Sequence, residues 1–192
     1  MIPHNKSNFA HTLHDQDTHR DIVEACQQGR RQAQFELYRL YAKPMYNVCL
    51  RMVRDELDAE DVLQNAFADV FAKIASFRFE SSVGAWIKRV VINACINFLK
   101  RRRLPLEVFE EWHSGLTETE EDADFENKGL QVDKVKKAIQ ELPDGYRVVF
   151  SLYALEGYDH QEIAEVLGVT EATSKSQYSR ARRRLKELLF DK

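Results

Sequence analysis

YDHQEIAEVLGVTEATSKSQYSRARRRL, residues 158–185, is the stretch of sequence that most clearly decides the fold. Its first part places Ile163, Ala164 and Leu167 at the spacing of one face of a short helix. Gly168 favours a turn, because glycine adopts a positive φ without strain. Thr170 is a suitable N-cap for a second helix. The stretch therefore predicts two short helices joined by a glycine turn.

The second of these helices has two chemically different faces. Small and apolar residues recur every three or four positions and are expected to pack on the first helix: Ser174, Tyr178, Ala181, Leu185 and Leu188. The opposite face is polar and basic, with Lys175, Ser176, Ser179, Arg180 and Arg183. Two helices of this kind around a glycine turn are typical of a DNA-binding helix-turn-helix.

An ordinary helical hairpin with a solvated basic face is the alternative. However, from Lys175 to Glu187 there are six Lys or Arg residues and one acid, in a chain whose net charge is -3. Ser and Gln are also poor choices for a purely structural helix face, but they hydrogen-bond well to bases and phosphates. We therefore favour DNA binding.

Composition limits the class of protein. A chain of 192 residues with 44% hydrophobic and 31% charged residues is typical of one globular domain or two small ones. No stretch is long and apolar enough to span a bilayer, and the N-terminus lacks a signal-peptide pattern, so we expect a cytoplasmic protein without direct membrane insertion. Cys26, Cys49 and Cys95 form no CxxC motif, which favours buried thiols over a metal site.

The N-terminal part begins with a polar, His-rich stretch, residues 1–20, which we expect to be a flexible tail; a weak metal-binding tract is the alternative. A helical pattern starts at Asp21, and Pro44 is expected to kink a helix or to separate two. Farther along, Asp58 is a candidate N-cap for a helix whose core stripe is Leu63, Phe67, Val70 and Ile74.

The exposed side of that helix carries Asp61, Gln64 and Asn65. Helix capping explains the acids at the start of the helix, and contact with solvent could explain the other polar residues on this side. The functional alternative is an acidic and polar docking face for a basic partner.

Residues 77–84 interrupt the periodicity and predict a loop, followed by a long amphipathic helix over 85–103. One-turn intervals along this helix separate Trp86, Val90, Asn93 or Ala94, and Asn97 or Phe98. Trp86 is interpreted as core in preference to a base-stacking platform. Between Ser81 and Arg103 there are six basic residues and no acid. Lys88, Arg89, Asn93 and Asn97 combine cationic and amide donors suited to phosphates and bases.

Residues 104–128 contain nine acids and a single Lys, which predicts a flexible acidic linker over 104–129. Beyond it, the pattern predicts a helix over 130–141, a turn over 142–145 and an apolar helix over 146–155. The expected fold is therefore all-α: a tail (1–20), a helical domain (21–103), the linker, and a helix-turn-helix domain (130–192).

Three motifs in this order resemble conserved regions of bacterial RNA polymerase sigma factors. DAEDVLQNAF (58–67) resembles the second conserved region. WIKRVVIN (86–93) and CIN (95–97) resemble the helix that melts and reads the −10 promoter element. LPDGYRVVF (142–150) with the helix-turn-helix resembles the fourth region, which reads the −35 element. Because no third domain intervenes, the chain resembles the extracytoplasmic-function (ECF) group.

The resemblance implies promoter-specific transcription initiation with core RNA polymerase, and it implies roles for residues. Contact with the clamp coiled coil is implied for Asp58, Asp61, Gln64 and Asn65, while the C-terminal domain would straddle the flap tip. Contact with the −35 element is implied for Lys175, Ser176, Gln177, Ser179, Arg180 and Arg183. Contact with the −10 element is implied for Phe77, Lys88, Arg89, Asn93, Asn97 and Arg101.

The loop at 77–83 matches the segment that captures a flipped −10 base, and the acidic linker matches the segment that threads the polymerase channel. Many relatives carry a basic or bulky residue where Gln177 and Ser179 stand, which leaves the −35 sequence open. The resemblance also implies an anti-sigma partner.

The main rival interpretation is a free-standing helix-turn-helix regulator that binds duplex DNA as a dimer. It leaves the basic helix at 85–103 and the acidic linker unexplained. The sequence contains no Gly-rich phosphate loop, no HExxH motif and no clustered nucleophile and base, so we expect neither an enzyme nor a cofactor or metal.

Overall fold

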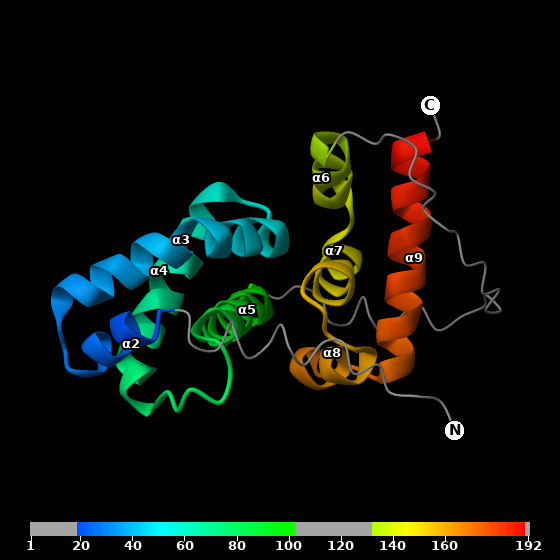
Figure 1. The fold of residues 1–192 in the computed structure, drawn as a ribbon. Helices are drawn as coiled ribbons and strands as arrows, with labels where there is room; N and C mark the ends of the chain where they lie inside the picture. The colour runs from blue at the N-terminus through cyan, green and yellow to red at the C-terminus, as the bar shows by residue number, and fades with distance from the viewer. Residues whose placement is uncertain (1–18, 103–131, 191–192) are drawn as a thin grey trace, which may run out of the picture. The chain divides into compact units, whose positions relative to one another are not determined.

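The computed structural model describes residues 19–102 and 132–190, and within these ranges every regular element is a helix (Figure 1). The chain divides into two compact units, residues 1–95 and 96–192, which are described separately. The prediction of an all-α chain with two helical domains is confirmed. Nearly all of the predicted tail and the whole predicted linker lie outside the described residues. No helix in the described ranges combines the length and apolar character needed to cross a membrane.

The first unit contains α2 (Arg20–Gln27), α3 (Arg31–Val53), α4 (Glu56–Lys73) and the 3₁₀ turn η2 (Ile74–Ser76), and α5 (Val83–Arg101) begins in it. Helix α3 packs on both α2 and α4. The predicted stripe of α4 is confirmed, since Leu63, Phe67, Val70 and Ile74 are all buried. Pro44 lies inside the continuous helix α3, so the chain is not divided there into two helices. All three cysteines are buried thiols, as predicted.

The N-cap of α4 is Asp55, and the prediction of Asp58 at this position is wrong. The carboxylate of Asp55 accepts a hydrogen bond from the backbone N–H of Asp58 at 3.0 Å. An N-cap requires extended backbone, which Asp55 has at φ -86° and ψ 136°. Asp58 lies in the first turn instead, where its negative charge still suits the positive end of the helix dipole.

The packed face of α5 is aliphatic, and its two asparagines lie outside that face. The buried residues are Val83, Ile87, Val91, Ile92, Cys95, Ile96 and Leu99, while Asn93 and Asn97 are exposed. Because residues 90–92 are all aliphatic, the sequence is compatible with more than one packed face of α5. Burial of two asparagine amides would require hydrogen-bond partners, so the face without them packs inward. Helix α5 approaches α3 closely at Gly84, where a Cβ atom would lie 3.0 Å from Cε1 of Tyr41.

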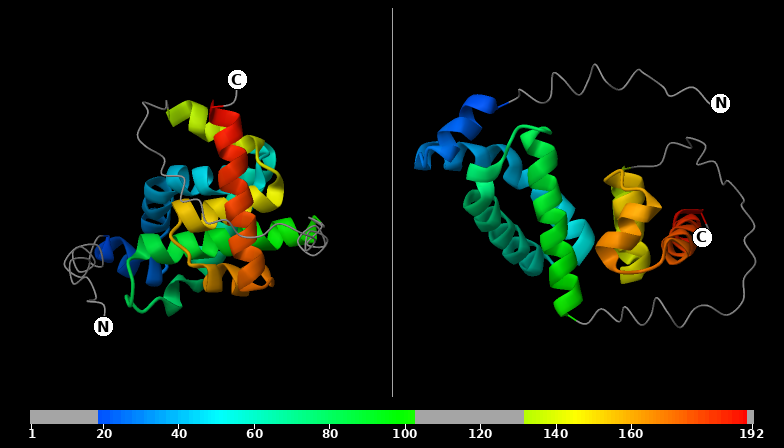
Figure 2. Two further views of the ribbon diagram at one scale, coloured as in Figure 1. Left: turned by 90° about the vertical axis from the view of Figure 1, so that its right-hand side faces the viewer. Right: turned by 90° about the horizontal axis from the view of Figure 1, so that it is seen from below.

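The second unit contains α6 (Val132–Glu141), α7 (Asp144–Phe150), the π-helical turn η4 (Ser151–Leu155), α8 (His160–Leu167) and α9 (Glu171–Phe190). Helix α9 packs against α6, α7 and α8 and is the long helix of this unit (Figure 2). One cluster of its core consists of Ala138, Ile139, Leu142, Phe150, Ala181 and Leu185. Helix α7 begins at Asp144, within the predicted turn.

Candidate nucleic-acid and polymerase interfaces

The turn between α8 and α9 has the predicted construction. Gly168 has φ 75° and ψ 37°, the left-handed conformation in which a side chain would be strained. The backbone N–H groups of Gly168 and Val169 both donate to the carbonyl of Ala164, at 2.9 and 3.0 Å. Thr170 caps α9, because its Oγ1 accepts the backbone N–H of Thr173 at 3.0 Å. The start of α9 is thereby fixed relative to the end of α8.

The start of α8 carries a capping box that the sequence interpretation missed. The Asp159 carboxylate accepts the backbone N–H of Glu162 at 2.8 Å, and the Glu162 carboxylate accepts the backbone N–H of Asp159 at 2.9 Å. The spacing Asp159-x-x-Glu162 was the available signal.

The inward face of α9 contains Ser174, Ala181 and Leu185, as predicted, and also Gln177. Gln177 is only 4% exposed, so it does not lie on the predicted DNA-facing surface. At 100° per residue, position 177 lies about one turn from Ser174 and about one turn from Ala181. Gln177 therefore shares the buried face of α9 with these two residues. The assignment of Gln177 to −35 contacts is therefore corrected to a packing position.

The outward face of α9 is formed by Lys175, Ser176, Ser179 and Arg183, which are exposed, and by Arg180, which is half-buried. Lys175 pairs with Glu171 one turn earlier, at 2.9 Å. The Ser176 hydroxyl donates to the Thr173 carbonyl at 3.0 Å. The structure thus brings together five of the six residues predicted for this surface.

Aromatic and polar contacts clamp α8 to α9 behind that surface. The His160 ring stacks on Tyr153 at 4.3 Å between centroids, and its Nδ1 lies 2.9 Å from the Ser174 hydroxyl. Burial and then the Lys175 ammonium lower the pKa of His160, although Glu171 and Asp159 act in the opposite direction. The neutral ring is therefore favoured, and it holds the helix pair without adding charge.

A buried cation also supports this unit. Arg147, only 1% exposed, pairs with Asp144 at 2.6 Å and donates to the Leu142 carbonyl at 3.0 Å. These contacts connect the turn before α7 to the helix itself. The motif at 142–150 contains Arg147, but no role was predicted for it. The i,i+3 spacing of Asp144 and Arg147 was the only sequence signal for this ion pair.

On α5, one exposed face carries Arg89, Asn93, Asn97 and Arg101. These residues are spaced by four, so they follow one another along the same side of the helix. Lys88 is half-buried and lies on the packed side instead, about half a turn away from them. Four of the predicted −10 residues are therefore brought together, and Lys88 is not among them.

Phe77 is also not available for direct contact. It is only 8% exposed and packs against Phe79 and Trp86, with ring centroids 5.0 and 5.1 Å apart. Its burial fits its position at the junction of η2, the loop and α5, where an apolar ring fills the space between the elements. The assignment of Phe77 to DNA contact is corrected to support of the loop, whose exposed side chains include Arg78 and Glu80.

The predicted docking face of α4 is exposed. Asp61, Gln64 and Asn65 lie on the surface, and Asp58 is half-buried. The Asn65 amide donates to the Asp61 carbonyl at 2.8 Å, which orients that side chain along the helix. At the start of the helix Leu57 is 75% exposed, which is high for a large apolar residue.

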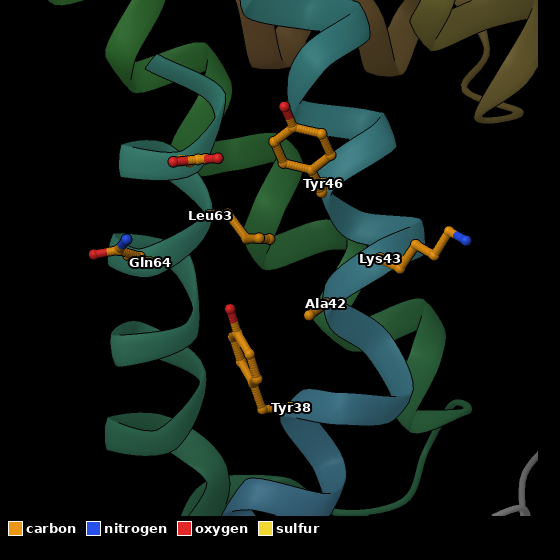
Figure 3. Close-up of a pocket in the computed structure, with 7 residues that line it drawn as sticks. Tyr38, Ala42, Lys43, Tyr46, Leu63 and Gln64 are labelled. Carbon is orange, nitrogen blue, oxygen red and sulfur yellow. The ribbon is translucent and has the colours of Figure 1, made fainter. Parts of the chain in front are cut away.

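A pocket of about 430 Å³ adjoins this face, between α3 and α4. Its lining residues are Tyr38, Ala42, Lys43 and Tyr46 of α3 and Glu60, Leu63 and Gln64 of α4. In Figure 3 the rings of Tyr38 and Tyr46 lie beside the space between the helices, whereas Lys43 points away from α4. Burial and then the carboxylates of Glu56, Glu60 and Asp55 raise the pKa of Tyr46.

Comparison with known proteins shows the family to which the chain is related. The family Sigma-70 region 2 matches residues 37–104, and Sigma-70, region 4 matches residues 133–185. The ECF RNA polymerase sigma factor SigM of Mycobacterium tuberculosis (strain H37Rv) is 31% identical over 173 residues, covering 88% of this chain and 83% of that protein. The chain belongs to the ECF RNA polymerase sigma factors.

A second ECF relative, SigM of Bacillus subtilis (strain 168), is 30% identical over 157 residues, covering 80% of this chain and 93% of that protein. Among solved structures, the sigma factor RpoE of Bartonella quintana, in complex with the anti-sigma factor NepR, superposes with a TM-score of 0.52 at 25% identity. That match covers 82% of this chain and 97% of RpoE. CnrH, in complex with the cytosolic domain of CnrY, shares the fold, with a TM-score of 0.52 at 22% identity over 90% of this chain and 97% of CnrH.

As an ECF sigma factor, the chain binds core RNA polymerase and promoter DNA and directs promoter-specific initiation of transcription. The region 2 match includes α4 and α5, and the region 4 match includes the helix-turn-helix. Both basic faces and the α4 face thus fall within the matched regions of this ECF sigma factor.

Proposed function

We propose that the outward face of α9 reads the −35 element and that the exposed face of α5, with the adjoining loop at 77–83, melts and reads the −10 element. The observation that carries this proposal is the presence of two separate exposed basic faces, one in each matched region. One face can hold duplex DNA and the other a separated strand, because basic surfaces bind both forms.

For the −35 element, the fixed start of α9 supports major-groove insertion. Thr170 and Gly168 set the direction of the helix, and Arg180 leaves the packed side one position before buried Ala181. An arginine in this place can bind guanine O6 and N7 with two hydrogen bonds, which discriminates by about 1–3 kcal/mol. Arg183, one turn farther along, is placed for a phosphate.

For the −10 element, one face of α5 carries two amide side chains, with a cationic side chain before and after them. Arg89 and Arg101 suit backbone phosphates, whereas Asn93 and Asn97 suit the edges of unpaired bases. The loop at the head of α5 would receive a base flipped out of the strand.

Docking on the clamp coiled coil is proposed for the α4 face and the neighbouring pocket. Gln64 offers an amide next to apolar Leu63 and the two tyrosine rings, and Asp61 offers an exposed carboxylate one turn earlier on α4. This combination suits a helix that carries basic and apolar side chains. The flap tip is the proposed partner of the C-terminal unit.

We further propose that the protein acts in the cytoplasm, has no enzymatic activity of its own, and is held inactive by an anti-sigma factor. The last point rests on membership of the ECF group and on likeness to RpoE of Bartonella quintana, whose structure contains the anti-sigma factor NepR.

The experiment that tests the proposal is run-off transcription with core RNA polymerase on a promoter library. We expect a small set of promoters that share −35 and −10 sequences and that are silent without the protein. The rival, a free-standing regulator, predicts sequence-specific duplex binding by the protein alone, with no dependence of that binding on polymerase.

A further inference from the structure

We infer that Gln27, the last residue of α2, is a positioning residue for the loop at 77–83, and that it sets the ability of this loop to receive a promoter base. The inference rests on the proposed role of the loop. It assigns a function to α2, whose residues 20–27 precede the matched region 2 segment.

The contact is made by one amide group with two backbone carbonyls. Nε2 of Gln27 donates to the carbonyl of Ile74 at 3.1 Å and to the carbonyl of Phe77 at 3.0 Å. Both partners are acceptors, so only the NH₂ side of the amide can face them. The amide thus uses its two hydrogens to hold the first residue of η2 and the first residue of the loop together.

These carbonyls lie where regular structure ends. At a helix terminus the last carbonyls have no partner within the helix and must find one elsewhere. Ile74 already accepts the backbone N–H of Phe77 at 3.1 Å, and Gln27 supplies a second donor there and a donor to Phe77. Without Gln27 the direction in which the chain leaves η2 would be less restricted.

The loop beyond this point is tied at further places. Arg20, at the other end of α2, lies over the ring of Phe79 at 4.5 Å, and Phe79 has a φ of 58°. At the end of the loop, the Ser82 hydroxyl accepts the backbone N–H of Ala85 at 3.2 Å and so caps α5. A loop with a non-glycine residue in the left-handed region is held by its surroundings, and α2 provides two of the contacts.

Pre-organisation of the loop lowers the conformational cost of receiving a base. In this role Gln27 acts on the loop and not on DNA, because the NH₂ group of its amide donates to the two carbonyls. Its effect should therefore appear in the selectivity of the loop and not in polymerase docking.

The test uses holoenzyme assembled from core polymerase and the full chain. The probe is a fluorescein-labelled single-stranded oligonucleotide carrying the −10 element of a promoter from the library, against the same oligonucleotide with the captured base replaced. Gln27→Glu keeps the size of the side chain but removes both donors, and Gln27→Ala removes the group. Gln28→Ala is the matched control, because Gln28 is the exposed neighbouring glutamine.

We expect both Gln27 variants to reduce the preference for the cognate oligonucleotide by about tenfold. Gln28→Ala should keep the wild-type preference, and transcription from a pre-melted template should be largely restored in the Gln27 variants. The ratio of the affinities for the cognate and the base-replaced oligonucleotide does not depend on the fraction of folded protein. A simple loss of stability therefore leaves this ratio unchanged.

An unchanged ratio in both Gln27 variants would overturn the inference while leaving the role of the loop intact. Failure of both variants to assemble with core polymerase would also overturn it, because Gln27 would then maintain the fold as a whole. Wild-type holoenzyme without any preference would overturn the proposed role of the loop, and the inference with it.

Discussion

Nδ1 of His160 lies 2.9 Å from Oγ of Ser174, so a hydrogen bond joins the first residue of α8 to the buried face of α9. Ser174 is fully buried, and its hydroxyl therefore needs this partner. The contact fixes the recognition helix from behind, on the side opposite to the proposed DNA surface.

Acid should weaken this clamp. Burial, followed by Lys175, lowers the pKa of His160 below its ordinary value, so the unfolded chain binds the proton more readily than the folded one. The stabilisation is complete above the unfolded pKa of about 6.5 and is lost as the pH falls toward the folded pKa. Thermal unfolding by far-UV circular dichroism should show a larger decrease in Tm on acidification for wild type than for His160→Gln. Parallel curves for the two proteins would contradict this.

Gln177 should affect stability and not promoter reading. It is 4% exposed and its Oε1 has no hydrogen-bond partner. Gln177→Met keeps the volume and helix propensity and removes the buried acceptor, so we expect stability in urea to rise by about 1 kcal/mol. Ser179→Ala, on the exposed side, is the control and should raise stability only by the helix propensity of alanine, about 0.5 kcal/mol. A change of −35 specificity in Gln177→Met would show that this side chain faces the DNA.

Two arginines on α9 should have different effects. Arg180→Ala should cost about 1–3 kcal/mol of −35 discrimination, because a bidentate base contact is lost. Arg183→Ala should weaken binding evenly across sequences and reduce the salt slope by about one. Transcription from promoters with altered −35 elements, measured at several salt concentrations, separates the two. An even loss with Arg180→Ala would mean that Arg180 positions the helix without reading it.

The α4 face should serve polymerase docking. Asp61 and Gln64 are exposed while the other side of α4 is core, so changing both to Ala should preserve folding. We expect the double variant to bind core polymerase about tenfold more weakly, because a few contacts dominate an interface. Asp69→Ala, two turns away on the same helix and paired with Lys73, is the control. Unchanged binding in a titration with labelled polymerase would show that the docking face is elsewhere.

The sequence was sufficient to predict the helices whose ends carry residues with strong local preferences. Gly168 and Thr170 predicted the turn because each residue type has a strong local preference there, and the stripe of α4 followed from spacing alone. Local preference did not settle the N-cap of α4: Asp58 was predicted there, but Asp55, the same residue type three positions earlier, occupies it.

Faces that depend on tertiary packing were predicted less well. In α5 the apolar run allowed more than one register, and only the packing showed that Lys88 does not share the exposed face of Asn93 and Asn97. Gln177 and Phe77 were assigned to DNA by position in the motifs, but both are buried. The contact of Gln27 with the carbonyls of Ile74 and Phe77 joins residues far apart in the chain, for which the sequence contains no signal.

The measurement that most directly tests the central claim is promoter opening, followed with 2-aminopurine placed in the −10 element of a promoter from the library. We predict that fluorescence rises only when the protein and core polymerase are both present, and that Asn93→Ala with Asn97→Ala abolishes most of the rise while duplex binding through α9 persists. Opening by polymerase alone, or full opening with the double variant, would contradict the account.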